Sequence, residues 1–245
     1  MQIIKSPQLE EPASCPYLPG RHKQYEFFLA NQLSAAEVVG CLEAGWRKFG
    51  PYYFRPACPD CRLCIPLRVP VAEFVPSRSQ RRVLRRNADL RVVFSPLQFS
   101  ERFYDLYRDH SGIRFGRETS LEEFFLHFYL PSCPSLQTEI YLGEDLVGIG
   151  FLDIGENCLS SVYFSFDPLL ANRSLGIFSV LQEIEHARRL GLAYYYLGYY
   201  VPGCPIMDYK DHFRPREHFD WDRGQWQRCS EPPGFLAKSS RNEVE

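Results

Sequence analysis

The sequence lacks any long apolar run. No stretch approaches the roughly 18 apolar residues that a membrane-spanning helix needs, so we expect no membrane partner. The opening residues, MQIIKSPQLEEP, contain no apolar core of the kind found in secretory signals, which favours a cytoplasmic location. The net charge is −2, with 45% hydrophobic and 24% charged residues, and these values exclude disordered and collagen-like classes.

The sequence also lacks an even set of cysteines that could pair as disulfides. It has nine, and three of them, Cys58, Cys61 and Cys64, have the spacing C-x2-C-x2-C. Such thiolates can hold zinc or an iron–sulfur cluster, with Cys15 or Cys204 as a fourth ligand. The alternative is that they are turn residues and buried thiols. In either case we expect the three cysteines to lie close together on a loop near Cys15.

Basic residues are concentrated in one segment. Residues 77–91 carry a net charge of +5, and the first ten contain no acidic residue that could pair with arginine at helical spacing. Arginine suits bidentate phosphate contacts, so the run predicts a polyanion site. A solvated helix face is the alternative. The arginines expected to contact a nucleic-acid backbone are Arg81, Arg82, Arg85 and Arg86.

Hydrophobic periodicity and capping residues predict an α+β fold. Ser34 and Ser120 each begin a capping-box pattern. The expected helices cover about 35–44, 97–109, 121–129 and 173–190. The expected strands cover 46–55, 67–75, 138–142, 146–154, 158–166 and 193–200, with tight turns at 143–145 and 155–157.

The order of helices, antiparallel meander, helix and strand is typical of acyltransferases of the GNAT type. We therefore expect a small cysteine-bearing N-terminal domain at 1–76, a GNAT-like domain at 77–230 and a flexible tail at 231–245. In that fold a glycine-rich loop usually holds the pyrophosphate of coenzyme A at a helix N-terminus. Here residues 172–176, NRSLG, contain a single glycine, which favours another acyl donor such as a charged tRNA.

Six segments in order resemble the arginyl-tRNA–protein transferase family, and more closely its bacterial aspartate/glutamate leucyltransferase branch. They are CPYLPGR at 15–21, RPACPDCRLCIPLR at 55–68, SRSQRRVLRRN at 77–87, SSVYFSFDP at 160–168, RSLGIFSVLQEIEHARRLGLAYYYLGYY at 173–200 and CPIMDYKDHFRP at 204–215. The resemblance implies that leucine passes from leucyl-tRNA to the N-terminal amine of proteins beginning with Asp or Glu. It further implies that the product is marked for degradation by the N-degron route.

Three alternatives remain open at this point. Arginine is the donor in the wider family, a coenzyme A-dependent N-acetyltransferase would share the fold, and a cysteine-rich RNA-binding module would need no activity. The proposed transfer needs no cofactor for its chemistry, because the donor ester is already activated and an α-amine with a pKa near ~8 loses its proton readily. Positioning and oxyanion stabilisation should then dominate.

Polar groups near the end of the last predicted strand are the candidate catalytic residues: Tyr199, Asp208, Tyr209 and Lys210. Tyr and Lys can donate to an oxyanion, and Asp208 can orient the amine or accept its proton. The competing interpretation of the tyrosines is that they are core residues with satisfied hydroxyls.

An acidic acceptor residue requires a cation, for which arginine has the best geometry. The candidates are Arg21, Arg68, Arg78 and Lys210, of which Arg21 and Arg68 have structural ion pairs as the alternative. Aromatic side chains would stack on the terminal adenine of the tRNA.

Overall fold

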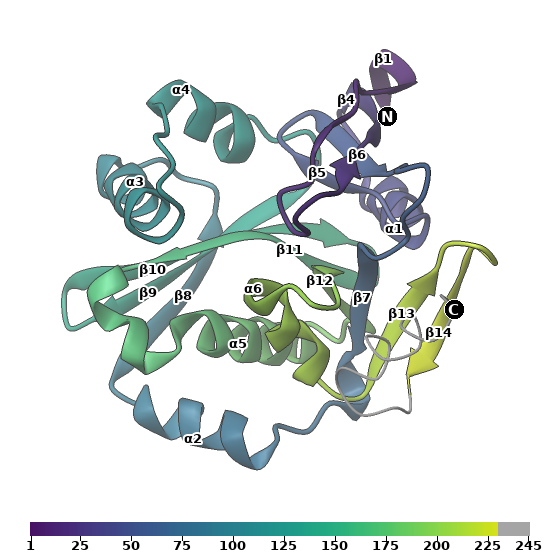
Figure 1. Ribbon diagram of the computed structural model, residues 1–245. Coiled ribbons are helices and arrows are strands. Elements are labelled where there is room, and N and C mark those ends of the chain that lie inside the picture. The colour runs from purple at the N-terminus through teal and green to yellow at the C-terminus, as the bar shows by residue number, and fades with distance from the viewer. Residues whose placement is uncertain (230–245) are drawn as a thin grey trace.

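The computed structural model describes residues 1–229. Its central feature is an eight-stranded mixed sheet (Figure 1). The tail predicted at 231–245 lies outside the described residues. The strand order is β14-β13-β7-β12-β11-β10-β9-β8. Their bounds are β7 Ile65–Pro70, β8 Leu90–Pro96, β9 Ser135–Leu142, β10 Asp145–Gly155, β11 Cys158–Phe166, β12 Tyr194–Tyr200, β13 Arg216–Asp220 and β14 Gln225–Cys229.

The predicted meander and the helix after it are confirmed. β9, β10 and β11 pair antiparallel, and α5 (Leu175–Arg189) then leads to β12, which pairs parallel to β11. The parallel pairing covers only residues 158–160 against 194–196. Beyond Ser160 the two strands separate, which leaves an opening in the middle of the sheet.

A second sheet, with the order β1-β4-β6-β5, forms most of the N-terminal part. Its strands are β1 Gln2–Leu9, β4 Tyr25–Asn31, β5 Arg47–Phe49 and β6 Tyr52–Pro56, and a short pair is formed by β2 Ala13–Ser14 and β3 His22–Lys23. The single strand predicted at 46–55 is instead a hairpin, because Gly50 turns the chain with a φ of 51°. β7 lies within the range 1–76 but pairs with β12 and β13 of the large sheet.

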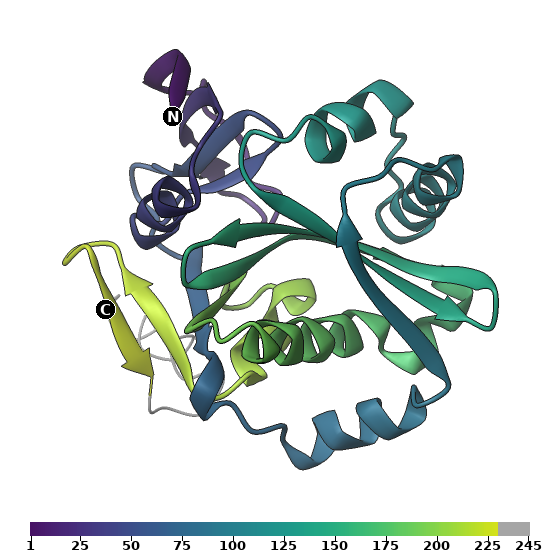
Figure 2. The ribbon, with the colours of Figure 1, turned by 180° about the vertical axis from the view of Figure 1, so that it is seen from behind.

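Helices cover both faces of the large sheet (Figures 1 and 2). α5 packs on one face with α2 outside it, whereas α3 packs on the other. The helices are α1 Ala35–Glu43, α2 Arg78–Arg86, α3 Glu101–Phe115, α4 Leu121–Phe124 and α6 Pro205–Asp208. A π-helical turn at Phe125–Tyr129 continues α4, and 3-10 turns lie at Val71–Glu73, Pro168–Arg173 and Tyr209–His212. The turn at Val71 ends the strand that was predicted to reach residue 75. The capping box at Ser34 is present in full.

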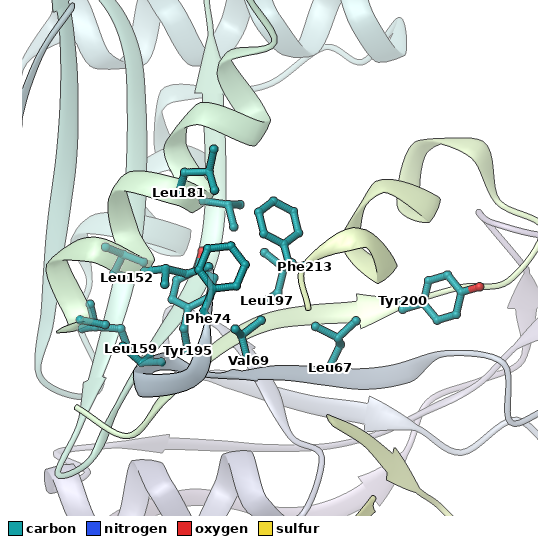
Figure 3. Packing of buried hydrophobic residues seen from close by; sticks show 14 of the residues in the cluster. Leu67, Val69, Phe74, Leu152, Leu159, Leu181, Tyr195, Leu197, Tyr200 and Phe213 are labelled. Carbon is teal, nitrogen blue, oxygen red and sulfur yellow. The ribbon is translucent and has the colours of Figure 1, made fainter. Parts of the chain in front are cut away.

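The largest core cluster lies between α5 and the middle of the sheet (Figure 3). Leu67 of β7, Leu181 of α5 and Leu197 of β12 are each almost fully buried there. Tyr195 of β12 lies in the same cluster and is fully buried, so its hydroxyl requires an internal hydrogen-bond partner.

Candidate active site

A pocket of about 570 Å³ opens where β11 and β12 separate. We call it the splay pocket; its walls come from β5, the C-terminal end of α3, β11, the start of α5, β12 and the segment 205–210. Tyr17, from the CPYLPGR segment, adds an aromatic ring from the N-terminal part. The pocket therefore combines residues from most of the length of the chain.

Two cations, Arg47 and Lys210, lie together in the splay pocket. A Cβ atom on Gly198 would lie 3.3 Å from Lys210 Nζ and 3.8 Å from Arg47 Nη2. Arg47 donates to Ser160 Oγ at 2.8 Å and to the Ser161 carbonyl, and Lys210 Nζ donates to the Tyr199 carbonyl at 3.1 Å. Within residues 1–229 neither cation forms an ion pair with a carboxylate, so the pocket holds positive charge that an anionic group could neutralise.

Burial, and secondarily the neighbouring Arg47 charge, lower the pKa of Lys210 to about 7. A bound carboxylate would oppose both effects and raise the pKa. At pH 7 the unliganded side chain would be about half protonated, and a bound acid would favour the cation.

The four predicted catalytic residues have different places. Lys210, Tyr199 and Tyr209 line the pocket, whereas Asp208, at the end of α6, is not among its lining residues. The Tyr199 hydroxyl donates to the Gly45 carbonyl at 3.0 Å. That hydroxyl is satisfied by the backbone and ties β12 to the N-terminal part, which matches the structural alternative for this tyrosine.

The four residues predicted to bind the acidic side chain of the acceptor also lie in different parts of the structure. Lys210 is in the pocket, but Arg21 and Arg78 are exposed and do not line it. Arg68 is only 7% exposed and pairs with Glu43 and, at 2.7 Å, with Glu217. Its guanidinium also lies over the rings of Tyr194 and Trp226. Arg68 therefore forms structural ion pairs, which is the alternative that the sequence analysis gave to its binding the acidic acceptor residue.

The sequence interpretation missed Arg47, the cation that lies beside Lys210 in the pocket. It lies on β5 in the segment WRKFGPYYFR, which reads as an ordinary aromatic strand. The local sequence does not distinguish Arg47 from the neighbouring Lys48, which pairs with Asp153. Its contact with Ser160 spans 113 positions, and local patterns do not reveal such a pairing.

The arginine run forms α2, which Ser77 and Gln80 begin with a full capping box. All five arginines of the helix are exposed, and none pairs with a carboxylate among the residues described. Arg86 donates to the Asn172 carbonyl at 2.5 Å, and Asn87 Nδ2 donates to the Arg173 carbonyl at 2.9 Å. The helix is thus attached to the turn that precedes α5, at the rim of the splay pocket.

The predicted cysteine group lies near Tyr17 of the pocket lining, whose pKa is raised by burial and by the charges of Cys64, Cys204 and Cys15. Burial raises the pKa of Cys64 to about 12, and the charges of Cys58, Cys61, Cys15 and Cys204 add to the shift. Cys58 Sγ accepts from the Gln24 amide at 3.4 Å. In the described part of the chain, no three Cys, His, Asp or Glu side chains are arranged to hold a metal ion. The metal or cluster expected on Cys15, Cys58, Cys61 and Cys64 stays a prediction.

Glu183 is a buried carboxyl directly behind the pocket. It is 1% exposed and accepts from Ser179 Oγ and the Tyr195 hydroxyl. Burial raises its pKa to about 7, although both hydrogen bonds lower it. A buried acid with no cationic partner is costly to ionise.

This raised pKa predicts a pH-dependent stability. Because ionisation is harder in the folded state than in the unfolded chain, the free energy of unfolding should fall as pH rises from about 4.5 to about 7. The expected loss is on the order of 3 kcal/mol. Urea unfolding at pH 5 and pH 8 measures it, and Glu183→Gln, which cannot ionise, should flatten the dependence. An equal pH dependence in both proteins would contradict the assignment.

Comparison with known proteins identifies the family. Residues 13–82 match the model for the N terminus of the arginine-tRNA-protein transferases, and residues 102–220 match the model for their C terminus. The aspartate/glutamate leucyltransferase of Marinobacter nauticus is 38% identical over 89% of this chain and 94% of its own. That of Pseudomonas aeruginosa is also 38% identical, over 85% of this chain and 91% of its own.

Solved structures give only distant likenesses. The C-terminal domain of a putative lysylphosphatidylglycerol synthetase from Agrobacterium fabrum has a TM-score of 0.46 at 14% identity, over 67% of this chain and 51% of that one. FemX has a TM-score of 0.43 at 8% identity, over 66% and 59%. No helix among the described residues is both long and apolar enough to cross a membrane. On the sequence matches, the chain belongs to the arginyl-tRNA–protein transferase family, in its aspartate/glutamate leucyltransferase branch.

Proposed function

We propose that this protein transfers leucine from leucyl-tRNA to the N-terminal amine of proteins that begin with Asp or Glu. The relatives that match over most of the chain are named for this activity. The observation that carries the proposal is the pair Arg47 and Lys210, two cations without a carboxylate partner in one pocket of the described structure. Such a pocket suits an acidic acceptor residue, since a carboxylate entering it meets fixed positive charge.

We further propose that residues 77–230 act as a GNAT-type acyltransferase domain, to which the cysteine-bearing segment 1–76 contributes the strand β7. The meander, the crossover helix α5 and the separation of β11 from β12 support this assignment. The acceptor amine and the donor ester would meet in the splay pocket. There C–N bond formation needs mainly orientation and stabilisation of the oxyanion, and we assign the latter role to Tyr209 and Lys210 because both line the pocket.

We also propose that the enzyme acts in the cytoplasm, that its products are degraded by the N-degron route, and that the transfer reaction needs no cofactor.

Elemental analysis of protein purified without oxygen tests whether the cysteine group binds a metal. Zinc or iron at one equivalent would establish a metal on these residues. In that case Cys→Ser variants should lose the metal.

One assay tests the function. The purified protein is mixed with an Asp-initiated peptide and, in separate arms, leucyl-tRNA, arginyl-tRNA or acetyl-CoA, and the mass of the peptide is measured. A mass increase of one leucine residue in the first arm supports the proposal. An arginine or acetyl adduct instead would replace it with the corresponding alternative, and tRNA binding without any adduct would favour an RNA-binding module.

Four exposed arginines of α2 are proposed to contact the tRNA backbone: Arg81, Arg82, Arg85 and Arg86. Reversing both charges with Arg81→Glu and Arg82→Glu should raise the apparent KM for leucyl-tRNA and reduce the salt slope of binding by about 2, because each lost phosphate contact removes about one unit. Binding measured at four salt concentrations checks this. Arg223→Glu, at an exposed position in the β13–β14 turn, is the matched control and should leave the slope unchanged. An unaltered slope in the double variant would contradict the assignment.

A further inference from the structure

We propose that Glu183 accepts, through the hydroxyl of Ser179, the proton that the acceptor amine must lose before it attacks the ester. The inference rests on the proposed function and assigns a role to a carboxyl that does not itself line the pocket. Ser179 touches the pocket and is the link between the two.

The geometry of α5 creates the link. Ser179 and Glu183 are four residues apart and therefore lie on the same helix face. Ser179 lines the splay pocket, and its Oγ donates to one carboxylate oxygen of Glu183. The other oxygen accepts from the hydroxyl of Tyr195, a residue that is not among those lining the pocket. One hydroxyl thus separates the pocket from a proton acceptor.

The groups around Glu183 leave its charge uncompensated. Tyr195 of β12 and Tyr209 of the turn 209–212 are the titratable groups whose charges act with it, and both have raised pKa values. Gly150 of β10 packs against it, with Glu183 Oε1 3.4 Å from the position of a Cβ atom there. Thr138 of β9 lies beside Gly150 and adds only a neutral hydroxyl. Among residues 1–229, no Lys, Arg or His forms an ion pair with Glu183.

A carboxyl kept only for stability would gain from a cation or from replacement by an apolar side chain. An unpaired acid behind a reaction pocket is instead typical of groups tuned for proton transfer near neutral pH.

The step balances as follows. The ammonium group of the acceptor gives one proton to Ser179 Oγ as the Ser179 proton passes to the Glu183 carboxylate. The free amine then attacks the ester carbonyl, the C–N bond forms, and the C–O bond to the tRNA ribose breaks. The leaving ribose oxygen takes the second proton from the nitrogen. Glu183 later releases its proton to solvent, so one proton is produced per transfer.

The test compares Glu183→Gln, Ser179→Ala and Tyr195→Phe with the unmodified protein from pH 5.5 to pH 9, using leucyl-tRNA and an Asp-initiated peptide. The readout is the ratio of kcat values, in which the titration of Lys210 cancels because every protein retains it. The ratio of wild type to Glu183→Gln should reach about 100-fold near pH 7.5. It should fall toward pH 9, where the amine is already deprotonated in solution, and toward pH 5.5, where Glu183 is protonated.

The two hydroxyl variants distinguish a relay from a structural carboxyl. Ser179→Ala interrupts the path and should lower kcat with the same pH profile as Glu183→Gln. Tyr195→Phe removes a hydrogen bond that lowers the pKa of Glu183. The pH at which kcat falls on the acid side should therefore be higher in this variant, while the maximal kcat should stay within about 3-fold of the wild-type value. Circular dichroism and thermal unfolding confirm that each variant is folded.

A ratio that is constant with pH, or close to one, would overturn the relay. So would a Ser179→Ala variant with the wild-type profile. If the unmodified protein transfers no leucine, it is the proposed function that fails, and this result is seen before any variant is compared.

Discussion

Replacing Lys210 by methionine is expected to lower kcat/KM for Asp- and Glu-initiated peptides by about 10³-fold or more while leaving tRNA affinity unchanged. The acceptor carboxylate must lose its water shell to enter the pocket, and only a fixed cation recovers that cost. Lys210 and Arg47 lie side by side there, whereas Lys48, which also lines the pocket, is already paired with Asp153. Lys210→Arg keeps the charge and should retain much of the activity.

The KM for acidic peptides is expected to depend on pH through the charge of Lys210. Because the pKa of Lys210 is about 7, the free enzyme loses this cation as pH rises through that value. The KM for an Asp-initiated peptide should therefore increase above pH 7, and Lys210→Arg should remove the increase. Peptides beginning with Asp, Glu, Asn or Lys are compared by mass spectrometry.

Two exposed arginines serve as matched controls for this experiment. Arg21→Met and Arg78→Met change residues outside the pocket lining and should keep the wild-type preference for acidic peptides. If either control variant loses the preference for acidic peptides, or if Lys210→Met keeps it, Lys210 is not the residue that selects the acidic acceptor.

Replacing Arg68 by methionine should instead destabilise the fold, by about 3 kcal/mol. Arg68 forms ion pairs with Glu43 of α1 and Glu217 of β13. Its Nη1 also donates a hydrogen bond to the hydroxyl of Tyr196 at 2.9 Å. Removing it leaves Glu217, whose side chain is 16% exposed, without its cation. The free energy of unfolding in urea measures the loss.

The surviving folded fraction of Arg68→Met should still prefer Asp- over Asn-initiated peptides. Loss of that preference with unchanged stability would make Arg68 an acid reader after all. Arg108→Met is the matched control for the stability measurement, since its pairs with Asp105 and Asp109 are exposed and contribute little.

Local sequence patterns predicted much of the fold. Alternation and tight turns at Gly143 and Gly155 gave the β9–β11 meander, and a periodic apolar face ended by Gly191 gave α5. These features depend on side chains a few residues apart, so a short window of sequence contains them. The strands β1 and β4 were not predicted, because their pairing depends on partners distant in the chain. The hairpin β13–β14 pairs locally and was missed as well.

The candidate site divides in the same way. The sequence by itself determined the family, the arginine run at 77–91 and the presence of Lys210 in a segment close to the last predicted strand. Only the tertiary structure decided which charges are neutralised: Arg68 meets two carboxylates, whereas Arg47 and Lys210 meet none among the described residues. Sequence specifies that a cation is present, but the separation of β11 from β12 decides which cations face an open pocket. The physical reason is that electrostatic partners are set by distances across the folded chain, and such distances leave no periodic trace in the sequence.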